Sequence, residues 1–465
     1  MSRSRLNRRT FLRSTAPLAA AGVVTPYWLT GRGASAGEPA SKNDRPLVGV
    51  VGPGGRGLGD AHAAAQFGDV VAVCDVDRNR AEQAKAAFDG KPDIYGDYRK
   101  LMERSDVEVI VNGTPDHWHT AVAIAALKAG KDVYTEKPMT LTIDEGKLLR
   151  KVVAETGRIV QVGTQQRSDK RFQVAVDLVR QGRLGKLKQV WVALPYFSTK
   201  GGPFPAQPVP ESLDWDLYQG QAPEHDYCPE RTHSDFRWWY EYAGGIVTDW
   251  GNHHVDIAHW GMDCELTGPT SIEARGLLPN PKTPQHYNTP DRFFSRMLYP
   301  NGVELLYFAS LNQRLRYGRV EENEATTPEK VAWLFGNDVP EEIKTMNRDG
   351  IMFIGEEGRL FVNRGGLYGK LVEGMFTPEE IQKLQTADPT LEHMRNFFEC
   401  VKTRQEPVSP VRIQHRTVTA CHLTNLSLRL ERKLTWDPET EQIVGDDEAR
   451  AWQKREQRAP YVIEA

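Results

Sequence analysis

Residues 47–57 read Leu47-Val48-Gly49-Val50-Val51-Gly52-Pro53-Gly54-Gly55-Arg56-Gly57. The first five are apolar and mostly β-branched, as in a buried strand, and the next six form a G-x-G-x-x-G pattern. In this pattern the first glycine permits a tight turn, the second lets a pyrophosphate approach the backbone, and the third lets the next helix pack on the strand. The positive end of that helix attracts phosphate. We therefore expect a dinucleotide to contact Gly52, Gly54, Gly55, Arg56 and Gly57.

A second apolar run, residues 70–74, ends at Asp75, 18 residues past Gly57. A carboxylate at the end of the second strand binds the ribose hydroxyls of NAD and repels the 2′-phosphate of NADP. Arg78 and Arg80 follow closely and would tolerate that phosphate. The spacing predicts a site for NAD, with NADP left open as the alternative and with Arg80 beside the cofactor.

Predicted helices alternate with predicted strands from residue 58 onward. The expected helices are 58–67, 80–88, 119–129 and 143–155, and the expected further strands are 107–111, 132–135 and 158–162. Such alternation with short turns indicates an α/β fold with a doubly wound parallel sheet, in which ligands bind at the carboxyl ends of the strands. Two loops lie at those ends, Thr114-Pro115-Asp116-His117 and Glu136-Lys137-Pro138.

The composition narrows the class of protein. The chain has 465 residues, of which 39% are hydrophobic and 26% charged, so two or three domains with large cores are expected. Residues 1–36 hold six arginines and no acid, and without them 53 Lys and Arg face 62 Asp and Glu, a net charge of about −9. An acidic body argues against nucleic-acid binding, which depends on neutralising phosphates. Five scattered cysteines without a CxxC pair do not make a disulfide framework.

The amino-terminal residues have the order of an export signal. Arg8-Arg9 precede an apolar stretch over residues 16–29 and a small-residue cleavage site, Ala34-Ser35-Ala36. This order resembles a bacterial twin-arginine signal, whose substrates are exported folded and often with cofactor loaded. We expect a signal peptide over residues 1–36 and a linker over residues 37–45. The twin-arginine export machinery is then the expected partner and the periplasm the expected location. The alternatives for residues 1–36 are an uncleaved anchor and a disordered basic tail. No later segment has 18 uninterrupted apolar residues, so no membrane span is expected.

Four motifs occur in a characteristic order. They are the glycine pattern, Thr114-Pro115 with His117, Glu136-Lys137-Pro138, and Gly244-Gly245 followed by Asp249-x-Gly251-x-His253. Over residues 46–440 the chain resembles the family of glucose–fructose oxidoreductase, inositol dehydrogenase and the rhizopine-catabolism protein MocA.

The resemblance implies the domain organisation. A Rossmann domain is expected over residues 46–165 and a second, α+β domain over 166–440, followed by a C-terminal tail over 441–465. The second domain would hold an open, mostly antiparallel sheet whose face covers the nicotinamide. Dimers or tetramers formed through that sheet are also implied.

Three residues are predicted to carry the chemistry. Lys137 follows a strand end near the expected nicotinamide, where it can hold and polarise a substrate hydroxyl. Asp249 and His253 are four residues apart and share a face if a helix begins nearby, and a carboxylate that orients an imidazole suits general acid–base catalysis. The resemblance implies that His253 moves the hydroxyl proton and that Asp249 is its partner. A merely structural hydrogen bond between Asp249 and His253 is the alternative.

Other residues are assigned to binding. Those expected beside the cofactor, from their loops and from the resemblance, are Thr114, Pro115, His117, Glu136, Lys137 and Gln165. The candidates for substrate contacts are Arg167, Tyr240 and His254. A packing role is the alternative for His117. No metal is expected, because the histidines do not follow the His-Glu-x-x-His spacing.

Together these features predict an exported NAD(P)-dependent oxidoreductase that acts on a CH–OH group of a sugar, polyol or glycoside by hydride transfer. Outside the cytoplasm no pool of free nicotinamide is expected, so the cofactor is predicted to stay bound and to be regenerated within each turnover. Two schemes satisfy this condition: oxidation of one sugar coupled to reduction of another, or transient oxidation of a glycoside with elimination and re-reduction, as in NAD-dependent glycosidases. A sugar-binding protein without turnover is the third hypothesis.

Overall fold

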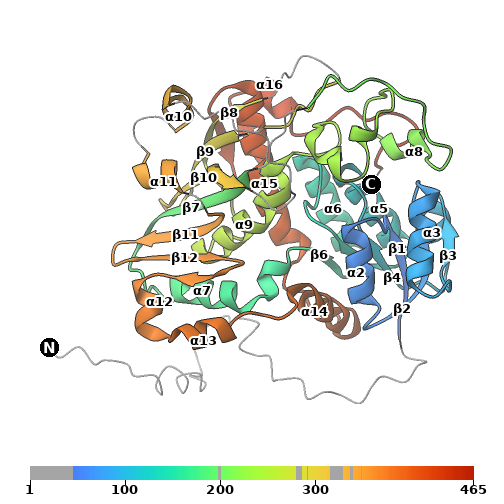
Figure 1. The fold of residues 1–465 in the computed structure, drawn as a ribbon, viewed down its shortest axis with the longest axis horizontal. Coiled ribbons are helices and arrows are strands. Elements are labelled where there is room, and N and C mark those ends of the chain that lie inside the picture. Colours follow the sequence, from blue (N-terminus) through green and yellow to red (C-terminus); the bar gives the residue numbers. More distant parts are fainter. Residues whose placement is uncertain are drawn as a thin grey trace.

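Two sheets organise the chain, one with six strands and one with nine, and they lie side by side with helices between and around them (Figure 1). The signal peptide and most of the linker that we expect, residues 1–44, lie outside the described residues. None of the helices formed by the described residues has the length and hydropathy that a bilayer crossing requires. This computed structural model describes residues 45–196, 201–278, 285–290, 292–314, 328–335, 339–346 and 348–464.

The first sheet has the strand order β3-β2-β1-β4-β5-β6, with all neighbours parallel. This order is that of a doubly wound Rossmann domain, so the alternation predicted from the sequence is confirmed. Its strands are β1 (Leu47–Val51), β2 (Asp69–Cys74), β3 (Asp93–Tyr95), β4 (Val109–Asn112), β5 (Asp132–Thr135) and β6 (Val160–Val162). Its helices are α2 (Arg56–Ala64), α3 (Arg78–Ala87), α4 (Tyr98–Met102), α5 (Asp116–Lys128) and α6 (Ile143–Thr156).

Local sequence sets the ends of these helices. The carboxylate of Asp77 accepts a hydrogen bond from the backbone N–H of Asn79 (3.1 Å) at the start of α3. The hydroxyl of Thr142 accepts one from the N–H of Glu145 at the start of α6, and Gly157 ends that helix in the left-handed region. Both are common capping arrangements. The first of them starts α3 three residues after Asp75.

The second sheet has the order β13-β12-β11-β7-β10-β9-β8-β14-β15. Only β7 and β10 are parallel neighbours, and the remaining pairs are antiparallel. The prediction of a mostly antiparallel second sheet is therefore confirmed. Its strands are β7 (Leu187–Tyr196), β8 (Ser271–Leu277), β9 (Arg292–Leu298), β10 (Glu304–Arg314), β11 (Gly350–Gly355), β12 (Arg359–Asn363), β13 (Gly366–Tyr368), β14 (Leu434–Asp437) and β15 (Gln442–Val444).

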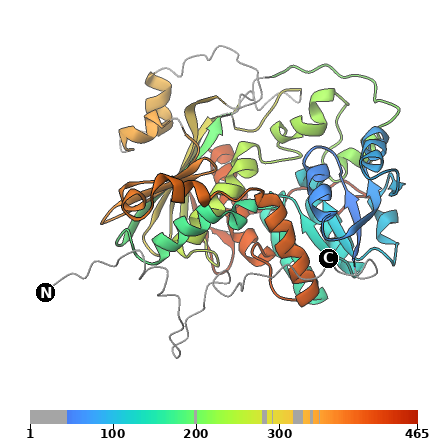
Figure 2. The same ribbon diagram turned by 60° about the horizontal axis from the view of Figure 1, so that its bottom comes forward.

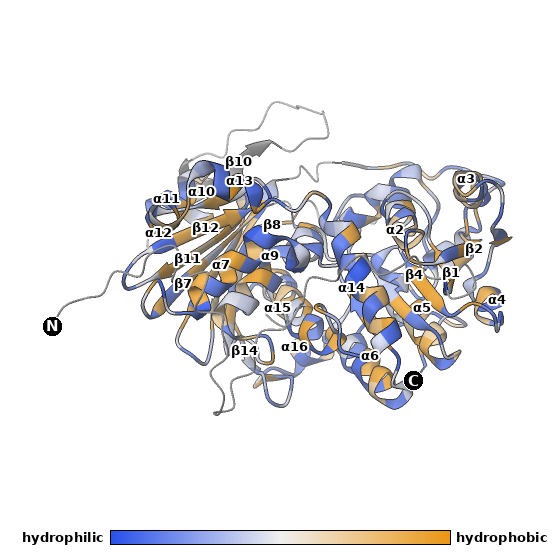
Figure 3. Ribbon diagram, turned by 90° about the horizontal axis from the view of Figure 1, so that it is seen from below, coloured by the Kyte–Doolittle hydropathy of each residue, from blue (hydrophilic) through white to orange (hydrophobic). Residues whose placement is uncertain are grey.

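Three helices cover one face of this sheet: α7 (Lys170–Arg180), α9 (Ile246–Met262) and α15 (Val411–Leu430). Their apolar residues share a core with alternate strand residues, as Val255 of α9 does with Val192 of β7, and apolar strands run beneath them (Figure 3). The resemblance implied that the sheet face covers the nicotinamide, whereas in the structure these helices lie between that face and the Rossmann domain. Because the helices bury that apolar face, α9 presents its polar residues toward the Rossmann domain instead.

Shorter helices complete the second domain. On the opposite face of the sheet, Phe335 of α10 and Ile343 of α11 pack against Trp191 and Phe308. The remaining helical segments are η3 (Gln165–Ser168), α8 (Trp215–Gln219), η4 (Pro229–Arg231), η5 (His233–Trp238), α10 (Pro328–Phe335), α11 (Glu341–Thr345), α12 (Lys370–Met375), α13 (Pro378–Lys383), α14 (Pro389–Thr403) and α16 (Asp447–Ala451).

Helix α14 returns to the Rossmann domain from far along the chain and lies beside α2 (Figures 1 and 2). Its Phe397 and Met394 join the core around Val50 of β1 and Tyr134 of β5. This helix thus completes the first domain, although it falls within the range 166–440 that we assign to the second from the sequence. The reason is packing: the helix has an apolar face, and the sheet offers an apolar surface.

The residues after 440, which we expect as a tail, also have a defined place. They add β15 and α16 at the edge of the second sheet and then return to the Rossmann domain. Arg458 pairs with Asp216 (2.5 Å), and the ring of Tyr461 packs edge-on against Trp118, with 5.9 Å between ring centroids. The chain end therefore links the two domains.

We expect Phe397→Ala to destabilise the protein by about 3 to 5 kcal/mol, because the side chain is fully buried and the cavity would not refill. Denaturant unfolding followed by circular dichroism measures the loss. The control Glu399→Ala changes an exposed residue of the same helix and should alter the free energy of unfolding by less than about 0.5 kcal/mol. Equal stability of the two variants would contradict the assignment of α14 to the Rossmann core.

Candidate functional site

The turn between β1 and α2 leaves room for a pyrophosphate. Gly52 has φ 72°, a conformation that side chains rarely adopt, and a Cβ at Gly57 would collide with the carbonyl oxygen of Gly52. Gly55 faces open space, with no atom within 4 Å of where its Cβ would stand. Open backbone at the positive end of a helix suits phosphate oxygens. The predicted glycine turn therefore fits a dinucleotide.

Asp75 and Arg80 flank this turn. Asp75 directly follows β2, and its carboxylate accepts a hydrogen bond from the N–H of Asp77 (2.9 Å). Burial raises the pKa of Asp75 to about 6, and the positive charge of Arg80 opposes that rise. The guanidinium of Arg80 lies against Gly54, where any Cβ would meet it. The structure thus brings both predicted residues to the cofactor turn, the acid that suits ribose hydroxyls and the cation that tolerates a phosphate.

A short ion pair joins the two domains at the ends of the parallel strands. The ammonium of Lys137, two residues after β5, lies 2.5 Å from a carboxylate oxygen of Asp249 in the first turn of α9. The guanidinium of Arg237 lies 3.4 Å from the same oxygen. Burial would raise the pKa of Asp249, but the charges of Lys137 and Arg237 outweigh burial and lower the pKa to about 2. Asp249 is therefore ionised throughout the physiological range.

Glu136 supports this pair from the Rossmann side. Its carboxylate accepts hydrogen bonds from Arg56 (3.0 Å), from Gln165 (2.8 Å) and from the backbone N–H of Lys137 (3.1 Å). Burial opposes ionisation, yet the charges of Arg56 and Lys137 lower the pKa of Glu136. Arg56 also pairs with the buried Asp60 (2.7 Å). The predicted Arg56, Glu136 and Gln165 thus connect the glycine turn to the loop that carries Lys137.

The imidazole of His253 lies one turn beyond Asp249 on α9 and is 6% exposed. Among the described residues no side chain or backbone group makes a hydrogen bond to its ring. Burial lowers the pKa of His253 well below its usual value, and the nearby charges of Arg364 and Lys137 lower it further. The ring is therefore neutral near pH 7 and can accept a proton.

The predicted partnership of Asp249 with His253 is wrong in its geometry. The two residues share a helix, but the carboxylate of Asp249 binds Lys137 and Arg237, and no hydrogen bond joins it to His253 within the described chain. The physical reason is that cations compete for a buried carboxylate more strongly than a neutral imidazole does. Asp249 therefore positions Lys137 rather than the histidine.

His119, which we did not predict, ties the two site loops together. One ring nitrogen lies 2.9 Å from the carbonyl of Thr114 and the other 2.7 Å from the carbonyl of Pro138. Thr114 in turn donates its hydroxyl to Asn112 (2.8 Å) at the end of β4. The predicted Thr114 and Pro115 are thus held at the carboxyl edge of the sheet, next to the loop that carries Lys137.

His117 does not face the cofactor. Its ring is fully buried, lies 2.8 Å from the carbonyl of Tyr218, and packs against Tyr242 with 4.9 Å between ring centroids. Burial lowers its pKa to about 4. A fully buried ring has no surface for a ligand, so the structure favours the alternative packing role.

Two of the predicted substrate residues are also enclosed. Arg167 is 3% exposed, and its guanidinium binds both carboxylate oxygens of Asp256 (2.7 and 2.8 Å) and Glu265 (2.8 Å). His254 is fully buried between Gln166 (3.3 Å) and Asp349 (3.4 Å). These interactions leave neither side chain free for a substrate, so both serve to hold α9.

The third predicted substrate residue, Tyr240, is covered as well. The guanidinium carbons of Arg429 and Arg455 lie 3.3 and 3.8 Å from its ring centroid. Two groups at such distances must occupy opposite faces of the ring. The ring faces of Tyr240 are therefore not available to a substrate.

Three charged residues near the ion pair were missed: Asp116, Arg237 and Arg364. Burial raises the pKa of Asp116 to about 8, so its carboxyl holds a proton at pH 7. Asp116 belongs to the Thr114–His117 loop that the sequence places at the strand ends, but it was given no role there. Arg237 lies in an aromatic stretch and Arg364 in a turn far along the chain, and no periodicity or motif selects either of them.

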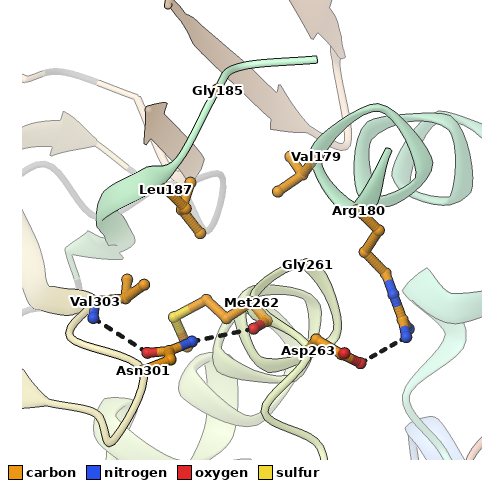
Figure 4. A pocket seen from close by; sticks show the side chains of 9 residues that line it. All are labelled: Val179, Arg180, Gly185, Leu187, Gly261, Met262, Asp263, Asn301 and Val303. Atoms are coloured by element: carbon orange, nitrogen blue, oxygen red, sulfur yellow. Dashed lines mark hydrogen bonds and ion pairs between the residues drawn. The ribbon is translucent and has the colours of Figure 1, made fainter. Parts of the chain in front are cut away.

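A surface pocket lies at the other end of α9 (Figure 4). Met262 and Asp263 line it, about 20 Å along the helix from Asp249 at 1.5 Å per residue. Its polar groups are already satisfied, since Arg180 pairs with Asp263 (2.5 Å) and Asn301 bonds to the carbonyl of Met262 (3.3 Å). The pocket is thus separate from the site around Lys137.

Comparison with known proteins agrees with this geometry. A model described as "Oxidoreductase family, NAD-binding Rossmann fold" matches residues 47–164. A second, described as "Oxidoreductase family, C-terminal alpha/beta domain", matches residues 188–299 and 350–463.

Individual proteins are similar to this chain in sequence or in fold. The scyllo-inositol 2-dehydrogenase (NAD(+)) of Bacillus subtilis is 23% identical over 73% of this chain and 80% of its own length. A glycosyl hydrolase family 109 protein of Shewanella pealeana is 29% identical over 39% of this chain, which spans only 44% of that relative. The crystal structure of aldose–aldose oxidoreductase from Caulobacter crescentus aligns with a TM-score of 0.60 and 16% identity, covering 84% of this chain and 99% of that one.

The two family models together take in the glycine turn, the Lys137 loop and helix α9. The first of them describes the NAD-binding domain that the glycine turn and Asp75 indicate. The chain therefore belongs to the Gfo/Idh/MocA oxidoreductase family, with an NAD-binding Rossmann domain followed by that family's C-terminal α/β domain.

Proposed function

We propose that this protein is an exported NAD-dependent oxidoreductase that acts on a carbinol group of a sugar, polyol or glycoside. The observation that carries the proposal is the contact between Lys137 and Asp249 (2.5 Å) near the neutral ring of His253, which has no hydrogen-bond partner among the described residues. This group lies at the carboxyl ends of the parallel strands, where the glycine turn would bring the nicotinamide. An ammonium beside a free imidazole is what oxidation of an alcohol needs.

We assign cofactor binding, polarisation of the substrate oxygen and proton transfer to different residues. The glycine turn, Asp75 and Arg80 would hold the dinucleotide, whose nicotinamide ring takes or returns a hydride. The ammonium of Lys137 donates a hydrogen bond to the substrate oxygen and favours its negative charge. His253 accepts the hydroxyl proton during oxidation and returns it during reduction. Asp249 fixes the ammonium, and Glu136 fixes the loop that carries it.

Export and cofactor retention form the second part of the proposal. The twin-arginine pattern at Arg8-Arg9 supports a periplasmic location, where a freely exchanging cofactor would be lost. Bound NAD would then be regenerated within each turnover. The similarity to a glycosyl hydrolase family 109 protein supports the glycosidase scheme as a second candidate, and coupled oxidation and reduction of two sugars is the first. Assembly into dimers or tetramers stays a prediction.

We expect Lys137→Met to slow reduction of bound NAD by about 10³-fold, since it removes the group that polarises the substrate oxygen. The measurement is NADH absorbance after mixing with a panel of neutral and acidic sugars and polyols. Affinity for NAD should stay within a few-fold, which separates loss of chemistry from loss of the site.

The matched control is Lys151→Met, which changes an exposed lysine of α6. It should leave both NAD affinity and rate unchanged. If Lys137→Met reduces NAD as fast as this control does, Lys137 has no part in the chemistry and the proposed mechanism fails.

The rate of oxidation should depend on pH through His253. An ordinary histidine becomes protonated near pH 6.5, but the lowered pKa of His253 keeps its ring neutral at that pH. We therefore expect kcat/KM to stay constant from neutral pH to below pH 6.5 and to fall only in more acid solution. His253→Asn should lower kcat/KM by about 10²-fold and remove that decline. A decline that survives in His253→Asn would assign the titration to another group.

Protein purified without added cofactor should release close to one equivalent of NAD or NADH on denaturation. The physical reason is that a periplasmic enzyme cannot draw on a cytoplasmic pool. Enzymatic assay of the supernatant for NAD, NADH, NADP and NADPH makes the measurement. An empty protein that consumes added NAD stoichiometrically would instead be an ordinary exchanging dehydrogenase, and the retained-cofactor scheme would be excluded.

A further inference from the structure

Arg364 lies in the turn between β12 and β13, which reaches from the second sheet to His253. Gln166 joins the two residues. With its amide oriented to satisfy both atoms, Gln166 donates to the carbonyl of His253 (2.8 Å) and accepts from Nε of Arg364 (3.1 Å). The charge of Arg364 also lowers the pKa of His253. The guanidinium is therefore close to the proposed reaction centre.

This guanidinium is held in place by the protein. Its carbon lies 4.5 Å from the ring centroid of Trp250, which follows Asp249 on α9. The turn itself is fixed, because the carbonyl of Arg364 accepts a hydrogen bond from Arg171 and the side chain of Asn363 accepts one from the N–H of Gly365 (2.8 Å). A cation fixed on an aromatic ring and an amide is pre-organised for a ligand.

Arg364 nevertheless has no anion of its own. Among the described residues no carboxylate lies at ion-pair distance from it, whereas Lys137 and Arg237 share Asp249, and Arg56 has Glu136. Arg364 keeps part of its surface in contact with solvent, and its two terminal nitrogens have no hydrogen-bond partner among the described residues. An oriented guanidinium with a free edge matches a carboxylate, which it can bind through two parallel hydrogen bonds.

The charges near Arg364 are engaged with other groups. Loss of hydration lowers the pKa of Arg364, whereas the carboxylates of Asp349, Asp249 and Glu136 raise it. Asp249 binds Lys137, Glu136 binds Arg56, and Asp349 lies 3.4 Å from the ring of His254. A ligand carboxylate in direct contact with the guanidinium would therefore stabilise its charge.

We propose that Arg364 binds a carboxylate of the substrate, so that the protein acts on acidic sugars, such as uronates and aldonates, in preference to neutral ones. This inference rests on the proposed function and specifies its substrate class. The second anion that could reach Arg364 is the cofactor's pyrophosphate. Contact with Trp250 and the bridge through Gln166 place the guanidinium beside His253 on α9, and this favours the substrate.

The test uses the full protein loaded with NAD and follows reduction of the bound NAD in single turnovers. The probes are matched pairs: D-glucuronate with D-glucose, D-galacturonate with D-galactose, and D-gluconate with sorbitol, with glucose 6-phosphate as a non-carboxylate anion. Each rate constant is divided by that of the neutral partner. Arg364→Gln, Arg364→Lys and the exposed control Arg275→Gln are compared with the unchanged protein, and NAD affinity is measured for each.

We expect at least one acid to reduce bound NAD with a larger rate constant than its neutral partner and than glucose 6-phosphate. Arg364→Gln should lower that acid-to-neutral ratio by about 30-fold or more, Arg364→Lys should restore part of it, and Arg275→Gln should leave it unchanged. Because the ratio cancels any effect on His253, a general loss of activity would not mimic this result.

Three outcomes would overturn the proposal: no acid binds or reacts better than its neutral partner, the ratio survives in Arg364→Gln, or that variant loses NAD affinity while keeping the ratio. The third would assign Arg364 to the pyrophosphate. If neutral sugars reduce NAD in a manner that depends on Lys137, the proposed function stands even when this inference fails. If no sugar of either kind reduces NAD, both fail.

Discussion

The ion pair between Lys137 and Asp249 constrains everything around it, because it is almost buried and its two ends belong to different domains. Its side chains are only 12% and 13% exposed. Removing a charge from water costs several kcal/mol unless a partner compensates for it, so moving the two charged groups apart within the protein is costly. The loop after β5 and the first turn of α9 must therefore stay together. That contact fixes the distance between the glycine turn, which fits the cofactor, and His253, to which we assign the proton transfer.

The same physics sets the protonation of the whole site. Burial favours the neutral form of each group, and only a neighbouring opposite charge reverses this preference. Asp249 and Glu136 touch cations on more than one side and keep a lowered pKa. Asp116 is held by burial at a pKa of about 8, although Arg237 and Lys137 lie near. His253, surrounded by cations, is driven to the neutral form. The result is an ammonium and an uncharged imidazole in the same site at pH 7, a combination that suits alcohol oxidation.

Which of these features the sequence could predict depended on how local they are. Consecutive residues form the strand, turn and helix around Gly52, and Lys137 lies in a short motif beside a strand end. The glycine turn and Lys137 could therefore be predicted from the sequence. The spacing of Asp249 and His253 correctly placed them one turn apart, but spacing does not choose a partner, and Lys137 comes from another domain. His117 and Arg167 occur in plausible loops, yet burial by distant aromatic and acidic side chains removed them from the site. Helix α14 and Arg364 depend on contacts across hundreds of residues, which no local pattern records.

Helix α9 shows why a protein would keep so many buried polar groups in one place. Asp256 accepts hydrogen bonds from Arg167 and Gln414, and His259 bonds to Tyr299 (2.5 Å). An apolar face could slide or rotate at little cost, whereas a buried polar group left without its partner costs about 1 to 3 kcal/mol. Rotating the helix by one residue, about 100°, would break all of these bonds at once. The polar network therefore determines which way α9 faces, and that orientation is what directs Asp249 at Lys137.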